Sequence, residues 1–266
     1  MHQHELSAYL NCLKIQFDVI LLTETRSINQ SITEKEFPNF DLYIDPPTIS
    51  FGGASILVRK DMCESIEPLD NLKLKSNCQC TKCLFESKFI KLKLDNNDLI
   101  VECIYRHPNG NPLHFIKEYS DLLGKLNTNA THIIGGDFNL NLLDYDKQYI
   151  REYVNNIKEN NFIPCITLPT RITSHSATLI DHIMVRVPKS KIQCKVNSGN
   201  LICDITDHLA NFTILDLNIR HQNYRPYIRL FMPNKIIEFN ININLEMSLL
   251  DNNIDENLHT RNVNIR

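Results

Sequence analysis

Short apolar runs separated by polar turns dominate the chain up to about residue 218. Runs such as 17–23 (FDVILLT) and 54–59 (ASILVR) predict buried β-strands, because they are short, rich in β-branched residues and bounded by turn residues. Leucine and tyrosine recur at helical spacing in residues 5–16, which predicts an amphipathic helix. Further strands are predicted at 89–94, 99–105, 132–134, 179–187 and 212–217, and further helices after Asn111 and around Tyr153.

The order of these elements indicates the fold class. Strands and helices are interspersed, and several pairs of strands are joined by short connections such as 95–98 (DNND). This pattern favours an α/β protein of the α+β type, a mixed sandwich, over a strictly alternating doubly wound sheet. Residues 1–218 are expected to form one domain. Residues 219–266 are polar, with Asn, Ile and Arg, and are expected to form a linker with at most one helix.

Composition narrows the class of protein. The chain has 266 residues, 42% hydrophobic and 22% charged, as is ordinary for a soluble globular protein. No apolar run reaches the length of a membrane span, and the start lacks a secretory signal. The nine cysteines are therefore expected to be reduced thiols. The net charge of −3 excludes a globally basic nucleic-acid binder, but it allows a local basic face or an acidic cleft neutralised by metal.

Candidate chemistry begins at Gly135-Gly136-Asp137-Phe138-Asn139, which closes a predicted strand. In extended backbone Asp137 and Asn139 would project from the same face, where a carboxylate and an amide can bind a metal or orient a water. Asp and Asn also favour plain turns, so the motif alone leaves both interpretations open.

Further acidic residues stand near predicted strand ends: Glu24, Asp181 and the pair Asp207-His208. Each has a simpler interpretation by itself, as a solvated strand end, a bond to neighbouring backbone or a turn cap. Buried carboxylates are costly unless they are paired or bound to metal, so their number points to a shared site.

Two other motifs could in principle bind a ligand. The cluster Cys78, Cys80 and Cys83 could hold zinc, but no clear fourth ligand is near in sequence, and reduced loop cysteines are the favoured interpretation. Gly52-Gly53 lacks the spacing of a nucleotide phosphate loop and is expected to allow a tight turn near the site.

Taken together, the motifs resemble the endonuclease/exonuclease/phosphatase superfamily over about residues 5–218. The ordered set is Glu24, Tyr105 in Tyr-Arg-His-Pro-Asn, Asp137 with Asn139, Asp181 in Ile-Asp-His-Ile, and Asp207-His208. The segments 169–173 (PTRIT) and 177–183 (ATLIDHI) are similar to the endonuclease domain of non-LTR retrotransposons, which precedes a reverse transcriptase. The catalytic motif of a reverse transcriptase does not occur in the chain.

The resemblance implies a four-layer α/β sandwich of two packed mixed β-sheets flanked by helices. Family members begin with a strand that carries an Asn of the site. Here the chain begins almost directly on the first predicted helix, so the first strand is expected to be missing, which would expose neighbouring strand edges and remove a ligand. The tail 219–266 would then be a connector towards a reverse transcriptase domain.

The resemblance also implies a Mg²⁺-dependent DNA endonuclease, with Mn²⁺ as the alternative ion, which nicks double-stranded target DNA for integration. Glu24 and Asp207 would bind metal, Asp137 would activate water, Asn139 would hold water or phosphate, and Tyr105 would bind phosphate. Asp181 would orient His208, which would donate to the phosphate. Residues expected to contact DNA are Arg106, Arg171, Ser174 and Thr178.

The expected location is the nucleus at the site of action and otherwise the cytoplasm, without membrane association or secretion. Two alternatives remain open at this point. One is an abasic-site nuclease or phosphatase of the same superfamily, and the other is a catalytically inactive retrotransposon relic.

Overall fold

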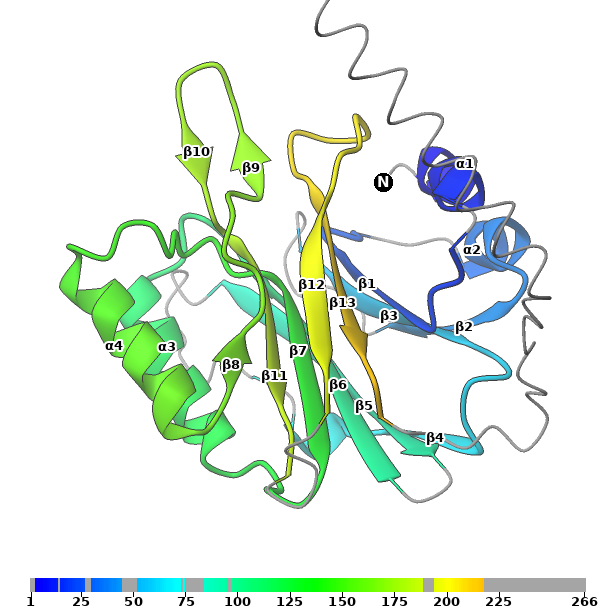
Figure 1. Cartoon of the computed structure of the whole chain (residues 1–266), viewed down its shortest axis with the longest axis horizontal. Helices are drawn as coiled ribbons and strands as arrows, with labels where there is room; N and C mark the ends of the chain where they lie inside the picture. Colours follow the sequence, from blue (N-terminus) through cyan, green and yellow to red (C-terminus); the bar gives the residue numbers. More distant parts are fainter. Residues whose placement is uncertain are drawn as a thin grey trace, which may run out of the picture. The chain divides into compact units, whose positions relative to one another are not determined.

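The computed structural model describes residues 3–13, 15–26, 30–44, 52–72, 74, 84–94, 97–188 and 194–217 (Figure 1). The chain divides into two compact units, Met1–Arg220 and His221–Arg266. The second unit lies outside the described residues, and so does the cysteine cluster at 78–83, so the expectations for the tail and for zinc are not addressed by the structure.

The first unit is built on two β-sheets. One is antiparallel, in the order β1-β3-β2. The other is mixed, in the order β4-β5-β6-β7-β11-β8, with β6 and β7 parallel and the remaining pairs antiparallel. The strands are β1 (Val19–Thr23), β2 (Phe40–Ile44), β3 (Ala54–Arg59), β4 (Ser65–Pro68), β5 (Phe85–Leu94), β6 (Asn97–Arg106), β7 (Thr131–Asp137), β8 (Ile163–Pro164) and β11 (Asp181–Arg186).

Two antiparallel hairpins complete the strands. The small hairpin joins β9 (Arg171–Ile172) to β10 (Ala177–Thr178), and the longer one joins β12 (Val196–Leu201) to β13 (Ala210–Leu215). The helices are α1 (Gln3–Leu13), α2 (Gln30–Glu36), α3 (Pro112–Leu123) and α4 (Gln148–Glu159), and a 3₁₀ turn covers Asp70–Leu72. No helix of the described part is long and apolar enough to cross a membrane.

Two hydrophobic cores hold the layers together. The first lies between the mixed sheet and helices α3 and α4, and its centre is aromatic: Phe115, Tyr119, Phe138 and Tyr153 are almost completely buried. The second lies between the two sheets and contains Ile56 and Val58 of β3 with Val101 and Cys103 of β6. Helix α2 packs on β2, outside the first sheet. The unit is therefore the four-layer α/β sandwich that the resemblance implied (Figure 1).

Strands β1 and β13 each have one unpaired edge among the described strands. β1 pairs only with β3, and β13 pairs only with β12. β1 packs on β6 and β7, and β13 packs on β11, which is the neighbour of β7 in the mixed sheet. β1 and β13 therefore lie over adjacent strands, but they do not pair with each other. The described residues place no strand between them.

Most predicted elements are present. The predicted strand 54–59 coincides with β3, and Asn111 caps α3 by accepting hydrogen bonds from the backbone N–H groups of Leu113 and His114. Predicted strands 89–94 and 99–105 pair as parts of β5 and β6. Elements that were not predicted are α2, β2, β4, β8, the strands of the small hairpin, and β12.

Candidate active site

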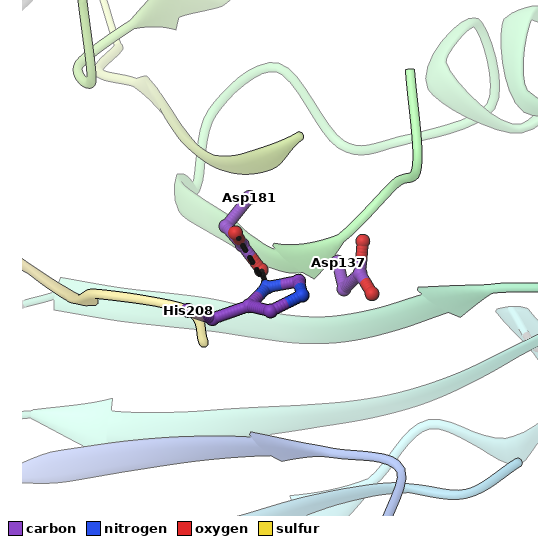
Figure 2. Close-up of side chains that lie close together, drawn as sticks. All are labelled: Asp137, Asp181 and His208. Atoms are coloured by element: carbon purple, nitrogen blue, oxygen red, sulfur yellow. Dashed lines mark hydrogen bonds and ion pairs between the residues drawn. The ribbon is translucent and has the colours of Figure 1, made fainter. Parts of the chain in front are cut away.

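Three chemically active side chains meet at one end of the mixed sheet. Asp137 is the last residue of β7 and Asp181 the first of β11, and the antiparallel register places them opposite each other. His208 lies just before β13, far away in sequence. One ligand atom from each of the three residues lies within 4.8 Å of the other two, as Figure 2 shows. The sheet register therefore brings together a group that the sequence could only suggest.

Asp181 orients His208. The Nδ1 atom of His208 lies 2.9 Å and 3.1 Å from the two carboxylate oxygens, and the other ring nitrogen is turned towards Asp137 (Figure 2). The buried hydroxyl of Thr170 donates to Asp181 at 2.6 Å and accepts from the backbone N–H of Asp181. Asp181 thus sits between a histidine and a threonine that both restrict its rotation.

The environment makes Asp137 hard to ionise. Burial, together with the like charges of Asp181 and Glu24, raises the pKa of Asp137 to about 7, although His208 and the backbone N–H of Asn139 oppose the rise. A carboxyl group with a pKa near neutrality can exchange a proton with water at physiological pH. It is also a group that a cation would stabilise in its charged form.

His208 is shifted in the direction that keeps it protonated. Burial lowers its pKa, but the hydrogen bond and charge of Asp181, with Asp137 and Asp207, outweigh burial and raise the pKa above its ordinary value. His182, the sequence neighbour of Asp181, behaves differently. His182 is fully buried beside Tyr153, and burial lowers its pKa to about 4, so it stays neutral.

Glu24 joins the site from the other sheet. It follows β1 at a φ of +52°, and its carboxylate accepts a hydrogen bond from the hydroxyl of Tyr105 at 3.0 Å. Tyr105 pairs with Asp137 in the parallel register of β6 and β7. Burial, then Glu24, raises the pKa of Tyr105, so it remains a neutral donor. Tyr105 therefore links Glu24 to the Asp137 end of the mixed sheet.

The turn that carries Glu24 rests on Gly52 and Gly53. Their carbonyl oxygens accept hydrogen bonds from the backbone N–H groups of Arg26 and Thr25. Gly53 has a φ of +113°, and a Cβ atom there would overlap the Thr25 hydroxyl at 2.4 Å, so only glycine fits. The backbone N–H of Gly53 donates to the carboxylate of buried Glu86. Gly52 and Gly53 thus lie against the turn that carries Glu24.

Asn139 meets Asp137 in a different way from the one expected. The two residues are not on one extended strand, because Asn139 adopts a left-handed φ of +48°. Its backbone N–H and its side-chain amide donate to the two oxygens of Asp137, at 2.9 Å and 3.0 Å. The motif is thus both a turn and part of the site, and the amide that was expected to hold water or phosphate is bonded to Asp137.

Arg106 requires a correction. It was expected to contact DNA, but it is only 3% exposed, and its guanidinium donates to the carbonyl oxygens of Gly110, Phe138 and Asn139. A group enclosed by three backbone acceptors is not presented to a ligand. The sequence motif predicted that Arg106 lies near the site, but it did not predict that the side chain is buried.

Asp207 and the small hairpin lie beside the site. Asp207 is exposed and forms an ion pair with Arg171 at 2.6 Å, and it is not part of the three-residue cluster. Asp207, which was expected to bind metal, is therefore less well placed to do so than Asp137 or Asp181. Ser174 is exposed in the hairpin loop and Thr178 is half-buried on β10, and an isolated bridge joins Arg171 to His208.

Two supporting residues were missed. Thr170 belongs to the motif Pro-Thr-Arg-Ile-Thr but was given no task, and it holds Asp181. Glu86 lies on β5, where nothing in its local sequence distinguishes it from a surface glutamate, and it holds the Gly53 turn. Both act across long sequence separations, which local patterns do not encode.

The donor set fits a hard divalent cation. Carboxylates of Asp137 and Asp181 converge, the Glu24 charge is felt at Asp137, and the pKa of Asp137 is raised by burial and by these like charges. Oxygen ligands of this kind suit Mg²⁺ or Mn²⁺, and a cation would relieve the repulsion. The residues present are consistent with such an ion.

The two sheets, their covering helices and the order of elements define the fold of endonuclease/exonuclease/phosphatase proteins. No protein-family model matches the chain, and neither does any curated protein. Solved structures do. An endonuclease/exonuclease/phosphatase family protein from Leptotrichia buccalis is 12% identical with a TM-score of 0.59, over 80% of this chain and 92% of that one.

Two further structures share this fold. The endonuclease domain of TRAS1, a telomere-specific non-LTR retrotransposon, is 13% identical with a TM-score of 0.56, over 80% of this chain and 90% of that one. TDP2 of D. rerio, solved with a single-strand DNA product, is 12% identical with a TM-score of 0.56, over 79% and 90%. At these identities the likeness establishes the fold alone.

Proposed function

We propose that this chain is a metal-dependent phosphodiesterase that nicks one strand of double-stranded DNA, as the endonuclease of a non-LTR retrotransposon does before integration. The observation that carries the proposal is the convergence of Asp137, Asp181 and His208, with Glu24 held nearby by Tyr105. The fold it shares with the TRAS1 endonuclease domain supports the retrotransposon assignment. The proposal places the active protein in the nucleus, with a reverse transcriptase as partner domain.

Each of these side chains would have a separate role in phosphodiester hydrolysis. Asp137 would take a proton from the attacking water, and the oxygen of that water would form a bond to phosphorus. The bond from phosphorus to the 3′ oxygen would break, and that oxygen would take a proton from solvent, leaving a 3′-hydroxyl and a 5′-phosphate. His208, kept protonated by Asp181, would donate to the phosphate oxygen on which charge accumulates. Tyr105 would donate to the phosphate or keep Glu24 in place.

Glu24, Asp137 and Asp181 would hold the cation. Bound Mg²⁺, or Mn²⁺ in its place, would neutralise the phosphate charge and lower the pKa of a coordinated water. Asp207, which was expected to bind metal, would instead fix Arg171 beside the site through their ion pair.

Nicking of supercoiled plasmid tests the proposal. The relaxed circle should appear with Mg²⁺ or Mn²⁺, disappear with a chelator, and be lost in Asp137→Ala and His208→Ala. Asp98→Asn is a matched control, because Asp98 pairs with Lys91 on β5 and β6 at a distance from the site. Metal-dependent nicking that survives in Asp137→Ala would place the chemistry elsewhere.

The second candidate is a nuclease or phosphatase of the same fold with a different substrate. The single-strand DNA product in the TDP2 structure belongs to that protein, and it supports a DNA substrate for a protein of this fold. Turnover of plasmid, abasic duplex and inositol phosphate by one preparation separates these activities. DNA binding without turnover of any of the three would favour the inactive relic.

A further inference from the structure

Arg106 is one of two buried arginines that donate only to backbone carbonyl oxygens in the hydrogen bonds the structure describes. It ends β6, and its Nε, Nη1 and Nη2 atoms donate to Phe138 at 2.6 Å, Gly110 at 2.7 Å and Asn139 at 2.6 Å. The planar guanidinium can donate in several fixed directions at once, which an ammonium group cannot do. Two segments far apart in sequence are thereby tied to one side chain.

Hydrogen bonds between Arg106 and Asn139 are donated by both residues. The side-chain amide of Asn139 donates to the carbonyl oxygen of Arg106 at 2.7 Å, and the same amide donates to Asp137 at 3.0 Å. The backbone N–H of Phe138 donates to Ile180, next to Asp181. The turn between Asp137 and Asn139 is therefore held from three sides, by Arg106, by Asp137 itself and by the residue before β11.

These hydrogen bonds stabilise an unfavourable backbone conformation at Asn139. Asn139 is in the left-handed region, which is unfavourable for residues other than glycine unless the surroundings enforce it. Without Arg106, the carbonyl oxygens of Phe138 and Asn139 would be buried without a donor, and the turn would relax to a different conformation. The Asn139 amide would then no longer meet both oxygens of Asp137.

We propose that Arg106 is a positioning residue, which sets the orientation of the Asp137 carboxylate by clamping the Phe138 and Asn139 carbonyls to the Gly110 loop. It acts through the backbone and makes no contact with DNA. This inference rests on the proposed function for its kinetic consequence, although its structural part stands on the hydrogen bonds alone.

Arg186 provides a matched control. It ends β11 at the opposite end of the same sheet, it is 4% exposed, and it donates to the carbonyl oxygens of Asn127 and Asn160. Its guanidinium also stacks 4.6 Å from the ring centre of Phe162. The two arginines therefore share burial and type of partner, and differ in their distance from the candidate site.

The test compares Arg106→Lys and Arg106→Gln with Arg186→Lys and Arg186→Gln. All four should lower Tm. Only the Arg106 pair should lower kcat for plasmid nicking, by about 100-fold as expected when a reacting group is misplaced, with KM little changed. Hydrogen exchange at the backbone N–H of Asn139 should become faster in the Arg106 pair and stay unchanged in the Arg186 pair.

Several outcomes would overturn the inference. Full activity in Arg106→Lys would mean that charge matters and geometry does not. A rise in KM at constant kcat would indicate direct contact with DNA, and a loss of Tm alone would leave Arg106 as a structural residue. If the wild-type protein nicks no DNA, the proposed function fails, and exchange at Asn139 still decides the positioning claim.

A milder variant covers the case in which the Arg106 variants do not fold. Gly110→Ala keeps Arg106, but its Cβ would lie 3.1 Å from the His107 carbonyl oxygen and 3.5 Å from Nη1 of Arg106. The Gly110 loop, whose carbonyl oxygen accepts from Arg106, must shift by a few tenths of an ångström relative to the His107 and Leu84 carbonyl oxygens, so Asn139 exchange should rise and kcat should fall in part. Unchanged exchange and unchanged kcat in Gly110→Ala would contradict the inference.

Discussion

The Nδ1 atom of His208 lies 2.9 Å from a carboxylate oxygen of Asp181, and Thr170 donates to that same oxygen at 2.6 Å. This shared acceptor connects the segment before β13 with β11 and with the chain before β9. One consequence is that the imidazole cannot rotate without breaking its bond to Asp181. Another is that the second ring nitrogen is held towards Asp137 (Figure 2).

Asp181→Asn should lower the pKa of His208. In the wild type, Asp181 is the largest influence that raises this pKa against the effect of burial, and an amide removes its charge. Carbon-bound ring protons followed by NMR give the titration directly. Asp207→Asn is the control, because Asp207 is exposed and lies 4.0 Å from the other ring nitrogen, so its effect should be smaller. Equal effects of both variants would contradict the assignment.

The same variant should lose stability mainly at acidic pH. A histidine whose pKa is raised by folding stabilises the folded state fully below its unfolded value of about 6.5, and this contribution disappears as pH rises through the folded value. The difference in Tm between wild type and Asp181→Asn should therefore be larger at pH 5.5 than at pH 9. A difference that grows with pH would show that the pair does not act through His208.

Asp137→Asn should gain stability relative to wild type as pH rises. The folded pKa of about 7 is above the ordinary 3.8, so ionisation of Asp137 destabilises the fold progressively between these values. The Tm of the variant minus that of wild type, measured without divalent metal, should increase from pH 4 to pH 8. Millimolar Mg²⁺ should raise the Tm of wild type and have less effect on the variant. No metal effect on wild type would argue against a metal site.

Glu102→Leu should stabilise the protein. Glu102 lies on β6 within the aromatic core, it is completely buried, and neither carboxylate oxygen has a hydrogen-bond partner within the described part of the chain. Burial raises its pKa well above the ordinary range, so it is neutral and unsatisfied, at a cost of about 1–3 kcal/mol. Chemical denaturation measures the gain. The exposed Glu67→Leu on β4 is the control and should change little.

Gly136→Ala should prevent or severely weaken folding. Gly136 has a φ of +142°, and a Cβ atom would lie 1.9 Å from the carbonyl oxygen of Ile104 on the parallel strand β6. Gly124→Ala is the matched control, because Gly124 caps α3 with an ordinary φ of −66°, and an added Cβ would make only van der Waals contacts, with the Ser120 and Asp121 carbonyl oxygens at 3.7 Å and 3.8 Å. That change should stabilise by about 0.4–1 kcal/mol. Thermal unfolding of the two variants makes the comparison.

Much of this architecture can be predicted from the sequence because local patterns determine it. The apolar run 54–59 gives β3, and Asn111-Pro112 fixes the start of α3 through the cap that Asn111 supplies. The strand β2 was missed although Phe40, Leu42 and Ile44 alternate with Asp41 and Tyr43, a pattern typical of a half-buried strand. The local sequence therefore contains the information that specifies β2.

The site could be predicted only in part, for a different reason. The types and order of Asp137, Asp181 and His208 are visible in the sequence, but the direction of a side chain depends on backbone that distant residues enforce. Arg106 looks like a surface arginine until the carbonyls of Phe138 and Asn139 are placed around it. Asn139 looks extended until its left-handed φ is known.

The unpaired edges of β1 and β13 give the two halves of the site unequal rigidity. Tyr105, Asp137 and Asp181 stand on central strands of the six-stranded sheet, where each strand has neighbours on both sides. Glu24 and His208 are carried next to strands with one neighbour each among those described, and such strands open more readily. A cation or a phosphate that contacts both Glu24 or His208 and the residues on the central strands would link parts of the site that no backbone hydrogen bond joins in the described part of the chain. Ligand binding would then also order this end of the sandwich.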